Sequence, residues 1–364
     1  MPSRRRFLAA ATAGCVGTAG CAGLAGVESS YEPGTDDTTE WRFPGRDRSA
    51  TAYAPDAAAP REGASERWRE EIPGANRRPV VGDGLVVVPT VDGLVAFDLS
   101  TGDERWSFSP SDGSWTSTPT LRDGTVYAGF ASEPSLRAFD AETGEPEWSF
   151  DARGTVEAAV VPNRDGDELY VGDDTGRVYV LGGDGSVEHT YDAVGAVTAV
   201  AGGRATVAVG TNGGQVYELY DDGSTFYPLW QRRVAGGVQD LAVLGGGSVA
   251  VSVFGDYVYR LQNGAHAGSD RWKASFTAND FLATPSHVVG TNLSTLAGLG
   301  TRDGDRLWSQ SGTYACAPAG AGDTFFVGGE YESSDGGYVE AYPLGGGGVL
   351  STGPDRRWRR DLDG

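Results

Sequence analysis

The sequence predicts an all-β chain folded as a single β-propeller of four-stranded blades. Three observations lead to this prediction. A fifteen-residue motif occurs twice, as LVAFDLSTGDERWSF at 94–108 and as LRAFDAETGEPEWSF at 136–150. An aromatic counterpart of its tryptophan recurs every 36 to 50 residues, which is the period of propeller blades. After residue 20, no window of a dozen residues has helical apolar spacing, whereas short β-branched and aromatic runs bounded by Gly and Asp are frequent.

The recurring aromatic residue marks the fourth strand of each expected blade. These residues are Trp68, Trp106, Trp148, Tyr191, Trp230, Trp272, Trp308 and Trp358. The seven intervals between them predict seven blades, with eight as the alternative. Trp68 precedes the first complete repeat and indicates an additional Trp-bearing strand, which is a candidate to pair with the C-terminal repeat and close the ring.

Each interval has the same internal order, illustrated by the first. A short apolar strand at 78–82 is followed by a second at 84–90, a third at 94–98 and the Trp-bearing strand. Small residues in the strands suit positions near a crowded propeller axis, and a closed ring buries both faces of every sheet. We therefore expect the repeats to be structural units and not separate sites.

The motif has a physical explanation as a hairpin. Asp98 can accept backbone N–H bonds from the residues that follow it, and Gly102 supplies the positive φ that a tight bulged turn needs. Trp106 can pack over the neighbouring blade while its indole N–H finds a backbone acceptor. The second copy has Asp140, Gly144 and Trp148 at the same places.

The N-terminus indicates export. Arg4 and Arg5, with Phe7 and Leu8, resemble the twin-arginine motif, and the apolar stretch that follows is too short to span a membrane. We expect residues 1–20 to be a signal peptide that ends at a lipobox. Its cysteine, Cys21, would then be lipidated and anchor the protein to the outer face of the cell membrane.

A second cysteine leaves an alternative for the anchor, because Cys15 follows the same three letters as Cys21. Residues 21–40 are small and polar, as in a flexible tether. Cys316 would then be the last remaining cysteine, and its small neighbours predict a buried small hydrophobe.

The charge is strongly acidic, with 29 Lys and Arg against 50 Asp and Glu and a net charge of −21. Lys273 is the only lysine. This balance favours adaptation to molar salt, where screening suppresses repulsion between carboxylates. It also excludes a nucleic-acid-binding role, because no basic stripe is present.

The repeated skeleton A-F-D-x-x-T-G-x-x-x-W is similar to that of the PQQ-like β-propellers. This superfamily contains quinoprotein alcohol dehydrogenases and the propeller lipoprotein of the bacterial outer-membrane assembly machinery. The resemblance covers roughly residues 64–361 of the expected propeller domain at 64–364. Residues 41–55 resemble the family's entry segment, which we expect to occupy 41–63. It implies either an enzyme that uses PQQ and a divalent cation or a scaffold that binds other proteins without chemistry.

The residues favour the scaffold. The adjacent cysteines common in the dehydrogenases are missing, and the intervals leave little room for pocket-building insertions. Residues 163–168 only faintly resemble a calcium loop. His189, His266 and His287 are scattered. We expect no catalytic residue, cofactor or metal. We predict a monomer that binds other exported or membrane proteins, with a PQQ-dependent oxidoreductase as the alternative.

Overall fold

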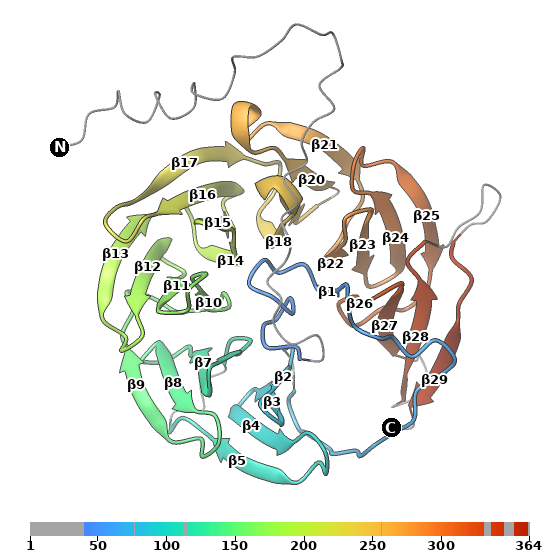
Figure 1. Cartoon of the computed structure of the whole chain (residues 1–364), viewed down its shortest axis with the longest axis horizontal. Coiled ribbons are helices and arrows are strands. Elements are labelled where there is room, and N and C mark those ends of the chain that lie inside the picture. Colours follow the sequence, from blue (N-terminus) through green and yellow to red (C-terminus); the bar gives the residue numbers. More distant parts are fainter. Residues whose placement is uncertain are drawn as a thin grey trace, which may run out of the picture. The chain divides into compact units, whose positions relative to one another are not determined.

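The computed structural model describes residues 40–75, 77–111, 116–255, 257–330, 336–345 and 353–362. In this part of the chain, seven sheets follow one another in sequence order around an axis (Figure 1). Each sheet is built from four strands that are consecutive in the chain, the first of them toward the axis, and the seventh sheet gains β1 (Tyr53–Ala54) at its inner edge. The predicted all-β propeller with seven four-stranded blades is therefore confirmed.

The first four sheets contain four strands each. The first sheet comprises β2 (Val80–Gly82), β3 (Leu85–Thr90), β4 (Gly93–Asp98) and β5 (Glu104–Phe108). The second comprises β6 (Thr120–Arg122), β7 (Thr125–Gly129), β8 (Leu136–Asp140) and β9 (Pro146–Phe150). The third comprises β10 (Val161–Pro162), β11 (Glu168–Gly172), β12 (Arg177–Gly182) and β13 (Val187–Asp192). The fourth comprises β14 (Val197–Gly202), β15 (Thr206–Thr211), β16 (Gln215–Asp221) and β17 (Phe226–Arg233).

The remaining sheets follow the same plan, and the seventh gains a strand. The fifth comprises β18 (Val238–Val243), β19 (Val249–Val253), β20 (Tyr257–Leu261) and β21 (Asp270–Ser275). The sixth comprises β22 (Asp280–Ala283), β23 (His287–Asn292), β24 (Thr295–Gly300) and β25 (Arg306–Ser311). The seventh comprises β26 (Ala319–Ala321), β27 (Thr324–Glu330), β28 (Gly337–Pro343) and β29 (Trp358–Leu362), with β1 (Tyr53–Ala54) parallel to β26. Two 3-10 turns, η1 (Gly245–Gly247) and η2 (Gly264–His266), lie in the fifth repeat.

Because adjacent strands within each repeat are antiparallel, the ring has two distinct faces. The cavity face, as we call it, carries the segments between sheets, such as 193–196, and the turns between second and third strands, such as 212–214. Backbone hydrogen bonds join these segments, for example from Asn212 N to Ala196 O at 2.9 Å. The opposite face carries the turns between first and second strands and between third and fourth strands.

Tryptophans of the fourth strands hold neighbouring sheets together. Trp106 of β5 lies on the turn of the next sheet, where Gly144 has a φ of 71°. A Cβ atom at Gly144 would lie 2.5 Å from the Trp106 ring, so this position accepts no side chain without movement. The indole N–H of Trp106 donates to Ala141 O at 2.8 Å. The same ring-on-glycine contact joins Trp68 to Gly102, Trp148 to Gly185, Trp230 to Gly268 and Trp272 to Gly304.

The segment that leads into the propeller fills the axis. Residues 41–54, which we call the axial segment, form hydrogen bonds to the innermost strand of each sheet in order, and most of these bonds use the backbone. The bonds run from Trp41 N to Val81 O, Leu121 N to Arg42 O, Arg48 Nε to Pro162 O, Gly202 N to Arg48 O, Val243 N to Ser49 O, Ala283 N to Thr51 O and Gly320 N to Ala52 O, at 2.5 to 3.2 Å. The axial segment therefore connects all seven sheets, in addition to the contacts between neighbours.

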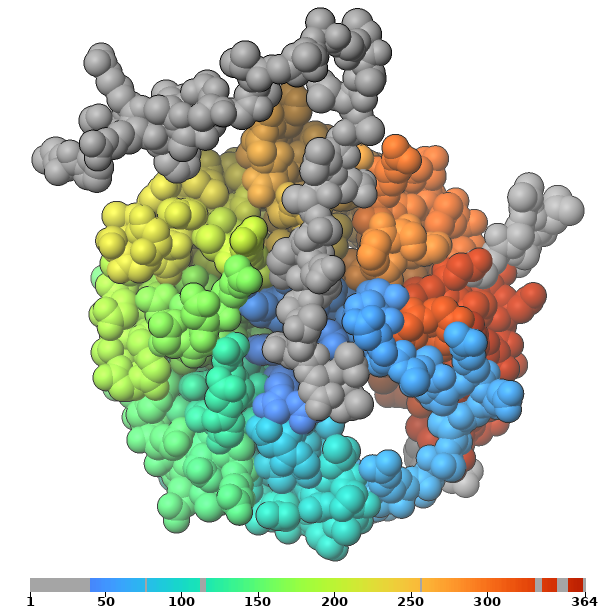
Figure 2. Space-filling view, in the orientation of Figure 1, coloured from blue at the N-terminus to red at the C-terminus, as the bar shows by residue number. Residues whose placement is uncertain are grey.

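The junction between the last sheet and the first differs from the other six. Buried apolar clusters join sheets 1–2, 2–3, 3–4, 4–5, 5–6 and 6–7. Among the described residues no such cluster joins sheet 7 to sheet 1, and the facing Val86 and Phe326 are only partly buried. Figure 2 shows an opening between the cyan first sheet and the red last sheet. We call this junction the seam.

The prediction that Trp68 lies on an additional strand is wrong, because residues 63–72 form no strand. This segment bridges the seam instead. At one end the indole of Trp358 donates to Pro60 O at 2.7 Å, and at the other the indole of Trp68 donates to Leu99 O at 3.0 Å. The chain crosses from the last sheet to the first here, so it cannot extend along β29 as a further strand.

Candidate functional site

A cavity of about 840 Å³ lies on the axis. Its walls come from the beginnings of the first strands and the segments that precede them, and its floor is the axial segment. Most of the wall is small and apolar, as in the run Ala158–Val161 and in Ala199 and Val200. Arg77, Glu157 and Cys316 in the lining are exposed, so the cavity is open to solvent on the cavity face.

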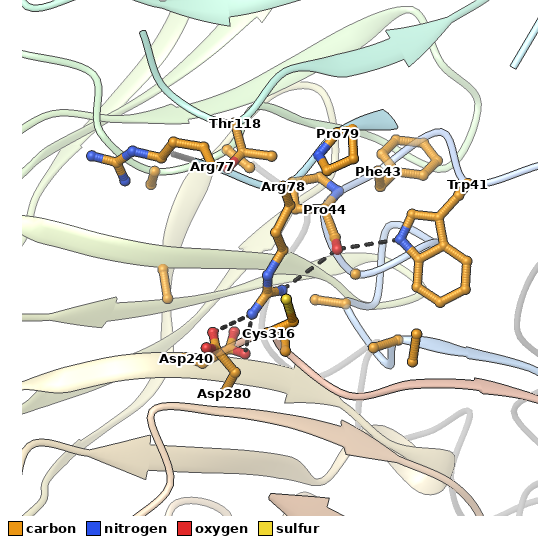
Figure 3. A pocket seen from close by; sticks show the side chains of 18 of the residues that line it. Trp41, Phe43, Pro44, Arg77, Arg78, Pro79, Thr118, Asp240, Asp280 and Cys316 are labelled. Carbon is orange, nitrogen blue, oxygen red and sulfur yellow. Dashed lines mark hydrogen bonds and ion pairs between the residues drawn. The ribbon is translucent and has the colours of Figure 1, made fainter. Parts of the chain in front are cut away.

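One ion-pair group spans the cavity (Figure 3). Arg78 precedes β2 and reaches across the axis to Asp240 of β18, at 3.5 Å, and to Asp280, the first residue of β22. It also donates to Pro44 O of the axial segment at 3.5 Å. The group therefore links the first sheet, the fifth, the sixth and the floor. The repeat pattern did not reveal it.

Burial shifts the pKa of the Asp240 carboxyl. Its side chain is 18% exposed, and this burial raises its pKa to about 6, while the Arg78 guanidinium opposes the shift and the nearby Asp280 adds to it. Both carboxylates face the same guanidinium, which offsets part of their negative charge. The three charged side chains of this group therefore interact with one another inside the cavity.

The prediction that Cys316 is buried is wrong. The sequence indicated a buried small hydrophobe, but the residue is exposed and belongs to the cavity lining (Figure 3). The residue lies in the connection between β25 and β26, where no strand buries it. Partial desolvation still raises the thiol pKa, and the Glu330 and Asp280 carboxylates act in the same direction. The pKa shift favours the protonated thiol over the reactive thiolate.

The motif residues named from the sequence lie away from the cavity, in turns on the opposite face. Asp98 accepts from Ser100 N at 2.8 Å and from Thr101 N at 3.1 Å, and these bonds with the Ser100 hydroxyl lower the pKa of its carboxyl to about 2. Asp140 makes the equivalent bonds to Glu142 N and Thr143 N. Their geometry is that of hairpin turns.

Two of the predicted structural tryptophans differ from the expected pattern. The indole of Trp230 donates to the Glu218 carboxylate within its own sheet and not to a backbone carbonyl. Trp308 is 4% exposed, stacks on Phe325 at 5.8 Å, and its indole N–H has no partner among the described residues.

The three histidines, which the sequence analysis did not assign as metal ligands, lie in different repeats. His189 lies in β13, His266 in η2 and His287 in β23. The 163–168 loop is a turn closed by Asn163, which accepts from Gly166 N at 2.6 Å and donates to the Asp167 carboxylate. Across the described ranges, no group of three or more His, Cys, Asp or Glu side chains is placed to hold a metal ion.

The described side chains do not fit the divalent cation that the resemblance implies for an enzyme. A divalent cation needs several oxygen ligands with uncompensated negative charge. The two adjacent carboxylates of the cavity, Asp240 and Asp280, instead share one guanidinium from Arg78.

The export and anchoring residues lie outside the described part of the chain. These are Arg4, Arg5, Phe7, Leu8, Cys15 and Cys21. In the part that is described, no helix has the length and apolar character needed to cross a membrane.

Charge divides the cavity face into two parts. The seven successive connections from the third sheet to the seventh contain a single charged residue, Asp256. We call the remainder of these connections the uncharged sector: 193–196, 212–214, 234–237, 254–255, 276–279, 293–294 and 312–318. Asp256, which follows one of them, lies outside the described residues. Other neighbouring charges, such as Asp192, Arg233 and Asp280, are the end residues of strands. The remaining connections carry Glu70, Glu71, Arg77, Arg78, Asp92, Glu133, Asp151, Arg153, Glu157, Asp173 and Asp174.

The comparisons with known proteins agree with this fold. A family model described as outer membrane protein assembly factor BamB matches residues 48–187 and 135–268. Comparison with curated proteins gives no match. The computationally designed Ika8 protein is 18% identical, with 79% of this chain and 86% of that chain covered and a TM-score of 0.61.

Two natural proteins of known structure are similar at the level of fold. BamB from Moraxella catarrhalis is 18% identical, with 75% of this chain and 86% of that chain covered and a TM-score of 0.55. Quinohemoprotein alcohol dehydrogenase from Comamonas testosteroni is 13% identical, with 92% and 74% covered and a TM-score of 0.70. One is an assembly factor by family and the other a dehydrogenase, so the shared fold does not choose between the two functions.

Proposed function

Because the chain belongs to the family of outer membrane protein assembly factor BamB, whose model matches more than half of it, we propose that it is a non-catalytic β-propeller that binds other proteins. In this proposal it is exported and anchored by a lipid on Cys21 at the outer face of the cell membrane. The observation that carries the proposal is the combination of this family with a cavity whose adjacent carboxylates, Asp240 and Asp280, are both paired with Arg78 of the protein itself.

A scaffold needs a surface that keeps its shape. The axial segment bonds to all seven innermost strands, and six apolar clusters hold neighbouring sheets, so the connections on the cavity face are fixed to a continuous framework. Loops presented by such a framework are the usual place for binding residues. This arrangement supports recognition of a partner on the cavity face.

The described chain begins at the opposite face, which suits an anchored protein. Glu40 accepts a hydrogen bond from Asp83 N at 3.1 Å, and Asp83 lies in the turn between β2 and β3. A tether of residues 21–40 would therefore join the ring on the face opposite the cavity. The cavity face would be available to proteins that approach from the far side.

Cell fractionation tests the anchor. We expect the wild-type protein to sediment with membranes and the Cys21→Ser variant to be released. The Cys15→Ser variant is the matched control, because this residue would leave with the signal peptide, and it should behave as wild type. Membrane association of Cys21→Ser at the wild-type level would refute the anchor at this residue.

Reconstitution with PQQ and Ca²⁺ tests whether the protein has oxidoreductase activity. Purified protein in molar salt is mixed with PQQ and Ca²⁺, and alcohol-dependent dye reduction is measured beside a quinone absorbance. We expect neither signal above that of protein without PQQ. Alcohol-dependent turnover would refute the non-catalytic function and favour the oxidoreductase.

A further inference from the structure

We propose that the uncharged sector is the surface that binds the partner, and that it takes an apolar, uncharged segment of another exported protein. This inference rests on the protein-binding function proposed above and adds to it a location and a partner chemistry. Its starting point is the scarcity of charge in seven successive connections, which contain Asp256 and no other Asp, Glu, Lys or Arg, in a chain of which 22% of residues are charged.

Exposed apolar side chains lie in the same sector. Phe254, in the turn between β19 and β20, is 77% exposed. Leu293, in the corresponding turn of the next sheet, is 71% exposed, and Val194 between the third and fourth sheets is 62% exposed. Single exposed apolar residues are common, but several on one uncharged surface mark an interaction site.

The backbone of the sector allows close approach. Gly213, Gly236 and Gly255 carry no side chain, and the connections around them are short. The sector also continues into the cavity wall through Ala315, Cys316 and Ala317, which are small and uncharged. An extended segment could lie across the glycines and direct an apolar side chain into the cavity mouth.

Charge decides what kind of segment fits. A charged side chain that is buried against the sector would lose its water without gaining an ionic partner, which costs several kcal/mol. An acidic partner that met the other part of the face would be repelled by exposed carboxylates such as Asp92, Glu133 and Glu157. Apolar contact also persists in concentrated salt, whereas exposed ion pairs are screened.

The position of the sector disfavours the lipid bilayer as its occupant. The chain that leads to the proposed anchor joins the ring through Glu40 on the opposite face, beside Asp83. Because the chain joins the ring on that face, we expect the sector on the other face to be available to other exported proteins.

Site-specific photo-crosslinking in living cells tests the location. A photoreactive phenylalanine replaces Phe254 or Leu293, and matched controls replace Tyr227 and Leu229, which are 45% and 48% exposed on the outer strand β17. We expect the sector positions to crosslink one protein, identified by mass spectrometry, and the control positions not to do so. Adducts with lipid or with a second copy of this chain would overturn the inference.

The crosslinks also separate the two levels of the proposal. Adducts to another protein that form only from control positions would leave the protein-binding function intact and refute the sector. An absence of protein adducts at every position tested would refute both the function and the inference.

Binding of the identified protein, purified, then tests the chemistry. We expect Phe254→Asp and Leu293→Asp each to weaken the Kd by about tenfold or more, as for central apolar interface residues, and Tyr227→Asp to leave it unchanged. The wild-type Kd should stay constant or tighten between 1 M and 4 M KCl. Equal losses in the control variant, or binding that weakens steeply with salt, would overturn the inference.

Discussion

The contact between Trp106 and Gly144 gives a prediction whose size follows from the structure. Gly144 and Gly124 lie in turns of the same sheet, with φ of 71° and 79°. An alanine at either position adopts a left-handed conformation, at a cost of roughly 1–2 kcal/mol. At Gly124 nothing lies within 4 Å of the new Cβ, whereas at Gly144 the Trp106 ring lies at 2.5 Å.

The Trp106 ring cannot move aside freely, because it is 7% exposed and its N–H is bonded to Ala141 O. Overpacking of this kind costs about 1–3 kcal/mol. We therefore expect Gly144→Ala to lower the free energy of unfolding by about 1–3 kcal/mol more than Gly124→Ala. The effect of alanine on the unfolded chain is the same for both and cancels.

Urea unfolding in constant molar KCl, followed by far-ultraviolet circular dichroism, measures this difference as a shift in midpoint. In the Trp106→Ala background the excess cost at Gly144 should disappear, since the obstructing ring is gone. Equal midpoints for the two glycine variants in the wild-type background would refute the account of the motif as a lock between sheets.

Three further predictions concern other parts of the ring. Trp308→Phe should lower the free energy of unfolding by about 1–3 kcal/mol less than Trp272→Phe does in the same assay. The reason is that the indole N–H of Trp308 has no partner among the described residues, whereas that of Trp272 donates to Thr301 O at 2.9 Å. Equal losses in the two variants would contradict this expectation. Burial raises the pKa of Asp240 to about 6, so its contribution to stability is complete below pH 4 and is lost as pH rises through 6. Between pH 4 and 7 the free energy of unfolding, measured with urea, should therefore fall by up to ~3 kcal/mol more in the wild type than in Asp240→Asn. Parallel pH profiles of the two proteins would count against a raised pKa at Asp240. Dilution from molar to ~0.1 M salt should abolish the circular dichroism of the fold, since the Debye length grows to about 10 Å, and an unchanged spectrum would rule out dependence on salt.

The ring was predictable because its signal is local. Asp98 bonds to residues two and three positions on, and Gly102 and Trp106 follow within one hairpin, so the motif can be read within a short window. Repetition at blade spacing then indicated the architecture. Trp68 shares the marker and the contact with Gly102 but not the strand, because pairing depends on a neighbour that the marker does not specify.

The cavity was not predictable, because its residues are distant in the sequence. Arg78 meets Asp240 across 162 residues and Asp280 across 202, and no repeat position relates them. Exposure of Cys316 depends in the same way on how the seventh sheet joins the ring. The uncharged sector did leave a signal, since Asp256 is the one charged residue of its connections in the printed sequence, but that signal has meaning only once the two faces are assigned.

The seam has a consequence for how such a chain can change its length. Inserting or deleting a repeat at any of the other six junctions would expose both halves of a buried apolar cluster, such as the one that joins Val87 to Leu121. At the seam the same change would disturb the bridging segment near Trp68 and Trp358 and separate the two ends of the axial segment, but it would divide no buried apolar cluster. Of the seven junctions, the seam is therefore the one at which gaining or losing a blade would expose the least apolar surface.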